Sequence, residues 1–263
     1  MRWFVFFLSS VSVCALFGAP VGNPSFPKEI QEGFYIPADY WIDVRAGYEG
    51  DFVADGRMKQ TQQGQGRVDE FEQNTNSGVV TFNLLDRIDV FALFGSSRVK
   101  TEWRFTDSTN TAHLVELETL YNFLWGVGAR FLLFEWSCCS LGCGGRYEKS
   151  NYDTVWLTSN GVVQGTNNSH LNWRVWQVDL DLSYKIDIFC PYIGIKYSNS
   201  AAEIGTFIVP IAANGSGSNH FENRTPVGIF IGCTLSTGKY FMLNLEGRLV
   251  DEEAVTISGD FRF

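Results

Sequence analysis

Apolar and polar residues alternate along most of this chain, and the last segment shows the alternation clearly. One parity is apolar and the other is polar: Val255, Ile257, Phe261 and Phe263 against Thr256, Ser258, Asp260 and Arg262. Successive side chains of a β-strand point to opposite faces, so this pattern predicts a strand with one apolar and one charged face. The strand ends on an aromatic residue, which is typical of the closing strand of an outer-membrane barrel.

The same alternation predicts ten strands in up-and-down order. They cover residues 40–49, 79–84, 88–94, 121–133, 139–148, 176–185, 193–198, 227–235, 241–249 and 255–263. In the fourth segment, Tyr121, Trp125 and Phe131 share the apolar parity, whereas Arg130 lies on the other. Because a charge facing lipid at the midplane costs about 2–4 kcal/mol, we expect the rings outside and Arg130 inside.

The links between these segments are alternately short and long. Short links are expected at residues 86–87, 135–136, 186–188 and 236–238, and long ones at about 58–77, 99–118, 150–171 and 199–224. Short periplasmic turns and long outside loops are typical of transmembrane barrels, with the link at Asp251 an unusually short outside loop. A twelve-stranded alternative adds residues 203–211 and 153–164, the latter with the hairpin signal Asn160-Gly161.

Composition and charge favour a membrane barrel over other classes. The 263 residues suit one barrel, the mean hydropathy is −0.05, and no run of about 20 apolar residues follows the N-terminus. The net charge of −9 argues against a nucleic-acid partner. A soluble β-sandwich would show the same alternation, but it would not place charges on the inward parity of so many strands.

The N-terminus has the features of a secretory signal peptide. Arg2 supplies a positive charge, residues 3–17 are mostly apolar, and Gly18 and Ala19 are small residues suited to cleavage. We therefore expect a cleaved signal at 1–18, a periplasmic segment at 19–39 and a transmembrane antiparallel β-barrel at 40–263. The expected location is the bacterial outer membrane, with lipid as the partner of the apolar face.

Charged residues of both signs fall on the inward parity and are the candidate pore-lining set. They are Asp43, Arg45, Glu49, Asp89, Arg130, Arg146, Asp179, Asp181, Lys196, Glu246, Arg248 and Asp260. Rings of charge along a water-filled pore set ion preference. Alternatively, these groups pair with one another and plug the lumen, since ten to twelve strands lie between filled and open barrels. The chain would then be a structural or adhesin barrel, cross-linked through its cysteines, without an open pore.

Five cysteines remain after the expected cleavage: Cys138, Cys139, Cys143, Cys190 and Cys233. An odd number in an oxidising compartment suggests a free thiol or a disulfide to another envelope protein, and small residues filling the wall are the alternative. Neighbouring Cys138 and Cys139 point to opposite faces, so they cannot easily share a metal ion. We expect Cys138 to face inward and Cys139 and Cys143 outward, and we expect no metal.

No cofactor or catalytic site is expected. The three histidines, His113, His170 and His220, fall in predicted outside loops, and no local motif ties them to a nucleophile or a supporting carboxylate.

Several collinear blocks resemble the chlamydial major outer membrane proteins. They include residues 20–24 (PVGNP), 47–53 (GYEGDFV), 86–91 (DRIDVF), 128–142, 176–197 and 247–263. The resemblance implies a porin of the outer envelope whose cysteines cross-link envelope proteins and which assembles into an oligomer. The chain is shorter than the family's main members because it lacks most of their variable outside segments.

Overall fold

The computed structural model describes residues 19–37, 40–61, 67–106, 111–166, 169–205 and 220–263. Its elements are one helical turn, α2 (Phe26–Glu29), and the strands β1 (Ile42–Gly56), β2 (Met58–Gln60), β3 (Arg67–Leu84), β4 (Ile88–Thr106), β5 (Ala112–Thr119), β6 (Asn122–Trp136), β7 (Cys139–Ser159), β8 (Val162–Val163), β9 (His170–Tyr184), β10 (Phe189–Gly205), β11 (His220–Asn223), β12 (Val227–Ser236), β13 (Phe241–Leu249) and β14 (Glu252–Arg262). Among the described residues, no helix has the length and apolar character that a membrane crossing requires.

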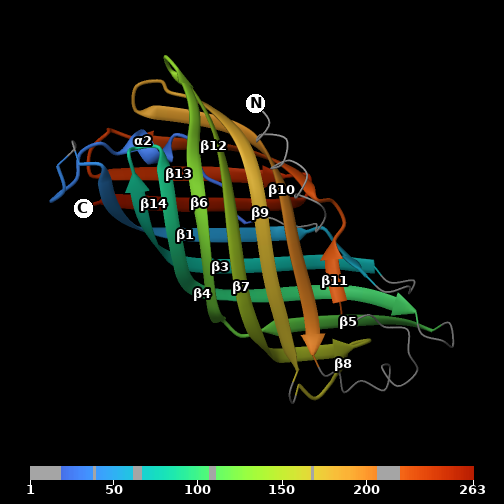
Figure 1. Cartoon of the computed structure of the whole chain (residues 1–263). Coiled ribbons are helices and arrows are strands. Elements are labelled where there is room, and N and C mark those ends of the chain that lie inside the picture. The colour runs from blue at the N-terminus through green and yellow to red at the C-terminus, as the bar shows by residue number, and fades with distance from the viewer. Residues whose placement is uncertain (1–18, 38–39, 62–66, 107–110, 167–168, 206–219) are drawn as a thin grey trace, which may run out of the picture.

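Ten of these strands form a closed antiparallel ring (Figure 1). The order around the ring is β1, β3, β4, β6, β7, β9, β10, β12, β13 and β14, and β14 pairs with β1 to complete it. Closure pairs the backbone of each of these ten strands on both sides. The predicted all-β barrel of about ten strands is confirmed.

The ring has fewer strands at one end than at the other. β13 and β14 form a short hairpin that ends at Val250 and Asp251. Beyond that tip β2, which continues β1, pairs directly with β11, which continues β12. β5 likewise continues β6 and takes its place between β4 and β7. The wall therefore narrows from ten strands at the short-turn end to eight at the long-link end: β2, β3, β4, β5, β7, β9, β10 and β11.

The short turns use residues with positive φ, as tight hairpins require. Leu85 and Asp86 have φ of 57° and 53°, and Asn160 and Gly161 have φ of 51° and 75°. The second pair confirms the hairpin signal of the sequence, because β8 folds back on the end of β7 there. The turn expected at residues 135–136 lies instead at residues 137–138, since β6 continues to Trp136.

The strands reach much further into the long links than the alternation predicted. β3, β4, β7, β9 and β10 include most of the described residues expected in outside loops. Residues 203–205 are the end of β10 rather than a separate strand, and residues 206–211 of that alternative lie outside the described residues.

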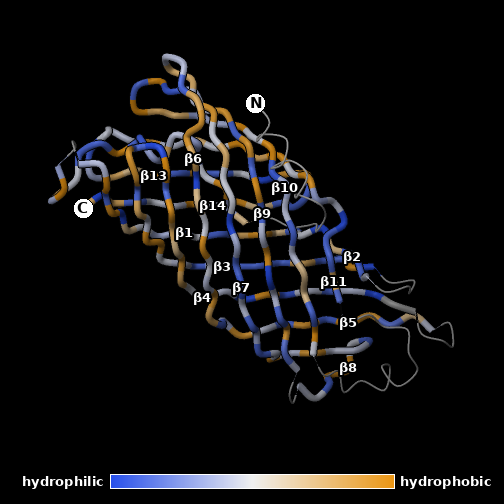
Figure 2. The backbone as a smooth tube through the Cα atoms, in the orientation of Figure 1, coloured by the Kyte–Doolittle hydropathy of each residue, from blue (hydrophilic) through white to orange (hydrophobic). Residues whose placement is uncertain are grey.

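The alternation did not predict these extensions as strands because their inward residues are apolar and their outward residues polar, the reverse of the membrane part. β9 shows this change. From Trp176 onward, its outward residues are apolar, and Val178 and Leu180 are 47% and 45% exposed. Before that point, the inward residues Leu171 and Trp173 are apolar and buried, while the outward residues are polar. Hydropathy along the strands is shown in Figure 2. An apolar outer face suits lipid and an apolar inner face suits a wall surrounded by water, so the wall extends beyond the membrane at its narrow end.

The outward rings of β6 match the sequence prediction. The side chains of Tyr121, Phe123, Trp125, Val127, Phe131 and Leu133 are all exposed on the outside. Arg130 turns inward, where its Nε donates a hydrogen bond of 3.0 Å to the carbonyl of Val21.

This belt predicts a depth-dependent cost for a charge on the outer face. Val127→Arg lies in the middle of the β6 belt and should lower the free energy of unfolding in lipid vesicles by about 2–4 kcal/mol. Val163→Arg is the matched control, because Val163 is also exposed but lies in the outer hairpin. Equal losses in urea titrations of the two variants would show that lipid does not cover the β6 belt.

Candidate channel lumen

All twelve candidate pore-lining residues face the inside of the ring. Nine of them are at most 5% exposed, and Arg130, Asp179 and Asp260 are partly buried. They do not stand around an open water column, because another part of the chain lies among them.

That part is the N-terminal segment, residues 19–31, which we call the plug. It enters at the short-turn rim, where the amide of Glu32 donates to the carbonyl of Gly238, and reaches Ala19 deep inside the ring. Sequence reasoning expected residues 19–39 in the periplasm; the structure places residues 19–30 within the ring instead. Their placement depends on hydrogen bonds to side chains that are distant in sequence, and the local pattern gave no signal of these bonds.

Carboxylate, amide and guanidinium groups of the wall hold the centre of the plug. Glu246 accepts hydrogen bonds from the amides of Val21 and Gly22 at 3.0 and 2.8 Å. Arg130 donates to the Val21 carbonyl and stacks between two rings, 4.9 Å from that of Phe26 and 4.4 Å from that of Phe91. The wall therefore satisfies plug backbone groups that no strand or helix would otherwise pair.

The base of the plug is held in the same way. The Nη1 and Nη2 atoms of Arg45 donate to the carbonyls of Phe26 and Pro27, at 2.7 and 2.9 Å. Asn83 also donates to the Pro27 carbonyl, at 2.9 Å, and Arg262 donates to the carbonyl of Ile30. Helix α2, a single turn, is thus fixed at its C-terminal end by cations, which suits its exposed carbonyls.

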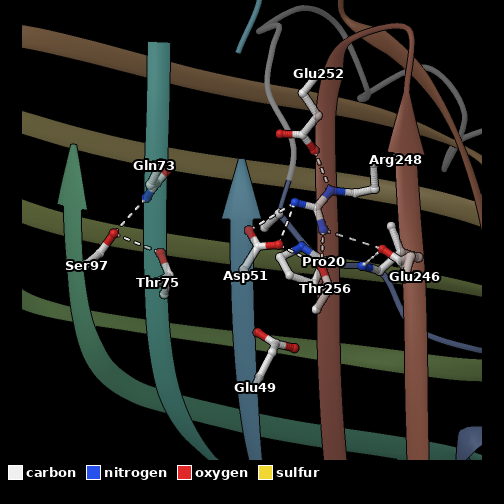
Figure 3. A network of polar contacts seen from close by, with 12 residues as sticks. Pro20, Glu49, Asp51, Gln73, Thr75, Ser97, Glu246, Arg248, Glu252 and Thr256 are labelled. Carbon is white, nitrogen blue, oxygen red and sulfur yellow. Dashed lines mark hydrogen bonds and ion pairs between the residues drawn. The ribbon is translucent and has the colours of Figure 1, made fainter. Parts of the chain in front are cut away.

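Beside the N-terminal tip of the plug, near Pro20, the charges of the lumen pair with one another (Figure 3). Arg248 donates to both oxygens of Asp51 at 2.7 and 3.0 Å and to Glu252 at 2.5 Å. Lys196 lies 3.0 Å from Asp251 and also contacts Glu252. Asp251 and Glu252 come from the tip of the β13–β14 hairpin, so this short loop ends in the lumen and completes its charge pairing.

The narrow end of the ring has an apolar interior. Fifteen buried residues form this outer cluster: Ala19, Met58, Phe71, Val99, Trp103, Val115, Leu117, Tyr152, Leu157, Leu171, Trp173, Val175, Ala202, Ile204 and Phe221. Phe71 and Trp173 stack with ring centroids 5.1 Å apart. Burial raises the pKa of Tyr152 to about 12, so its hydroxyl stays protonated and accepts a hydrogen bond from Gln73. The plug and the outer cluster therefore occupy the lumen in series and meet at Ala19, which belongs to both.

The cysteines lie at the short-turn end but do not pair with one another; all five described cysteines are free. Cys138 was expected to face inward, but it is exposed because the turn falls at residues 137–138. Cys139 and Cys143 are part-exposed on the outward parity. Cys190 is buried against the plug, with its Sγ 3.2 Å from Ser25 Oγ.

The described residues contain no group of three or more His, Cys, Asp or Glu side chains arranged to hold a metal ion. The histidines lie at the narrow end and have neighbours there: His170 Nδ1 is 3.1 Å from Asp153, and His220 Nε2 is 3.5 Å from Glu203.

Comparison with known proteins gives the same picture as the sequence resemblance. Residues 158–218 match the family model described as Chlamydia major outer membrane protein. The chain is 24% identical over 385 residues to the major outer membrane porin, serovar F, of Chlamydia trachomatis, with 98% of each chain covered. It is 26% identical over 373 residues to the major outer membrane porin of Chlamydia pneumoniae, with 96% of each covered. An outer membrane channel from Pseudomonas putida F1 superposes with a TM-score of 0.46 at 10% identity, covering 92% of this chain and 100% of that one, a likeness too loose to bear on function.

The resemblance to the chlamydial porins is thereby confirmed over nearly the whole chain, and with it the location in the bacterial outer membrane. The lipid contact of the apolar belt follows from that location.

The buried ion network predicts an asymmetric response to mutation. Arg248→Gln leaves Asp51 without its cation inside the ring, while Glu252 keeps Lys196, and should cost about 3–5 kcal/mol of unfolding free energy. Lys239→Gln removes an exposed pair with Glu32, 2.9 Å apart, and should leave the unfolding free energy nearly unchanged. Urea titrations in lipid vesicles measure both, and similar small losses would mean that the Arg248 network is hydrated and not buried.

Proposed function

We propose that this chain, which resembles the chlamydial major outer membrane porins along nearly its whole length, is a porin-like barrel for the passive diffusion of small solutes or ions. We further propose that the plug closes the lumen in the state described above and leaves it, at least in part, when the barrel conducts. The observation that carries this proposal is a charged lumen occupied by a separate segment of chain that is held by wall side chains and not by strand pairing.

The chemistry of the plug contacts favours reversible closure. The plug is held largely by hydrogen bonds from its backbone to wall side chains such as Glu246, Arg130 and Arg45. Water can replace each of these partners, so the net contribution of each bond is only about 0.5–3 kcal/mol. A lumen lined by charges of both signs would remain well solvated after the plug leaves, as a channel for ions requires.

A closed structural barrel is the second candidate, and the outer cluster favours it. Phe71, Trp173 and their neighbours fill the narrow end with apolar side chains, and they would still lie there after the plug has moved. In that case we propose that the barrel contributes to envelope structure, with exposed Cys138 as the thiol best placed for a disulfide to another envelope protein. Homo-oligomer formation and the signal peptide at residues 1–18 remain proposals under both candidates.

Straining the plug should open the pore if the first candidate is right. Gly22 has φ of +91°, and a Cβ there would lie 2.8 Å from the Phe26 ring, so Gly22→Val should destabilise the plug without touching the wall ladder. We expect more frequent or larger current steps in planar bilayers than for the unmodified protein. Gly165→Val is the control, because a Cβ at Gly165 meets nothing within 4 Å.

A chain that lacks residues 19–31 gives the decisive comparison. If this chain folds, as judged by heat-modifiable mobility, and still shows no current, the porin proposal fails and the closed structural barrel stands.

Ion selectivity provides a separate prediction. Asp179 and Asp181 face the lumen from β9, and Asp181 Oδ1 has no hydrogen-bond partner among the described residues. Neutralising both as Asp179→Asn and Asp181→Asn should shift the reversal potential in a salt gradient toward lower cation preference. The outward pair Asp153→Asn and Glu203→Gln carries the same charge change and should leave it unshifted. An unchanged potential in the first variant would rule out a role for these carboxylates in selectivity.

A further inference from the structure

An ordered ladder of side chains crosses the outer face of β7 and β9 just where the apolar belt ends. Tyr147 lies opposite Trp176, Lys149 opposite Arg174, and Asn151 opposite Asn172. Moving along the wall away from the membrane, one therefore meets an aromatic pair, then a basic pair, then an amide pair. We call the four polar residues Lys149, Arg174, Asn151 and Asn172 the headgroup patch.

The basic pair differs from the cations of β4. On β4, Arg98 lies 2.7 Å from Glu118, Lys100 lies 3.3 Å from Glu70, and Arg104 lies 2.8 Å from Asp69. In the described part of the chain, neither Lys149 nor Arg174 has an ion pair or a side-chain hydrogen bond, and both are exposed. The amide pair is exposed as well, and its side chains make no hydrogen bond to another described residue.

Like charges directly opposite on neighbouring strands oppose strand pairing, so Lys149 and Arg174 destabilise the wall unless an anion lies between them. The patch also forms part of a hollow of about 320 Å³, whose rim includes Glu203 and His220, which lie near each other. The hollow thus contains one ammonium group, one guanidinium group and two amides. These groups can donate hydrogen bonds to the oxygens of phosphate and hydroxyl groups.

The level of the patch identifies the anion. One row toward the short-turn end lie Tyr147 and Trp176, and the next outward residue of β9 is Val178, which is 47% exposed in the belt. Aromatic side chains of transmembrane barrels mark the interface between acyl chains and headgroups. The headgroup patch therefore lies at the depth of the lipid headgroups, on the side of the long links.

We propose that the headgroup patch binds a phosphorylated sugar headgroup of an outer-leaflet lipid. Lys149 and Arg174 hold the phosphate, Asn151 and Asn172 hold sugar hydroxyls, and Tyr147 and Trp176 contact the start of the acyl chains. This binding depends on the outer-membrane location and not on conduction, so it stands or falls separately from the porin proposal.

The test uses the full folded chain in zwitterionic detergent and three probes. They are a diglucosamine lipid with two phosphates, the same lipid after removal of both phosphates, and inorganic phosphate. We expect the phosphorylated lipid to bind at least about tenfold more tightly than the dephosphorylated one, because two charge-assisted hydrogen bonds are lost with the phosphates.

The variants separate the patch from general surface charge. Lys149→Gln with Arg174→Gln should abolish the preference for the phosphorylated lipid, whereas Arg98→Gln with Lys100→Gln removes the same charge from β4 and should keep it. The exchange of Lys149→Arg with Arg174→Lys retains both charges and should bind within about threefold of the unmodified protein. If the Gln variant does not fold, the comparison of the three probes on the unmodified protein still decides the test.

Three outcomes would overturn the proposal. They are equal affinities for the two lipids, an equal loss in the β4 control variant, and competition by inorganic phosphate at the concentration of lipid phosphate, which would indicate a site for free anions.

Discussion

The structure depends on one constraint, which is that a chain in hydrocarbon must pair its own backbone polar groups. A strand can meet this constraint only if a neighbour lies on each side, and a ring is the arrangement in which every strand has two neighbours. Ten strands satisfy it here, with β14 returning to β1. The alternation of apolar and polar residues follows, because each strand then has one face toward lipid and one toward the lumen.

The same constraint creates a problem on the inside. Inward residues such as Arg248, Lys196 and Arg45 carry charge and are at most 1% exposed, and an unpaired buried charge is costly. The protein solves this with two short pieces of chain that are not part of the regular wall. The β13–β14 tip brings Asp251 and Glu252 to the cations at mid-height, and the plug brings backbone carbonyls to Arg45, Arg130 and Arg262. Closure of the lumen is thus partly a consequence of how its charges are neutralised.

The features that depend on periodicity along the chain could be predicted from the sequence. The features whose position depends on contacts with residues distant in sequence could not. Ten strands, the outward rings of β6 and the inward position of Arg130 follow from alternation alone. The outer extensions of β3, β4 and β7 were assigned to loops because their polarity reverses where water replaces lipid. The inward orientation expected for Cys138 was wrong because a turn moved by two residues changes what its side chain faces. Residues 19–30 carry no periodic signal, and only the wall side chains that bind them fix their place.

The narrowing of the wall also bears on the order of assembly. The β2–β11 join consists of three residue pairs, Gln60 with Phe221, Lys59 with Glu222 and Met58 with Asn223. Its two sides are about 160 residues apart in sequence, so bringing them together costs loop-closure entropy. Very few hydrogen bonds form at this join to offset that cost. The β1–β14 seam is far longer and can form first. Together with the β12–β13 and β13–β14 pairings, it brings β2, the continuation of β1, next to β11, the continuation of β12. The narrow mouth is therefore expected to be the last part of the ring to close during folding and the first to fray. The apolar packing of the outer cluster is then what holds this end of the barrel closed.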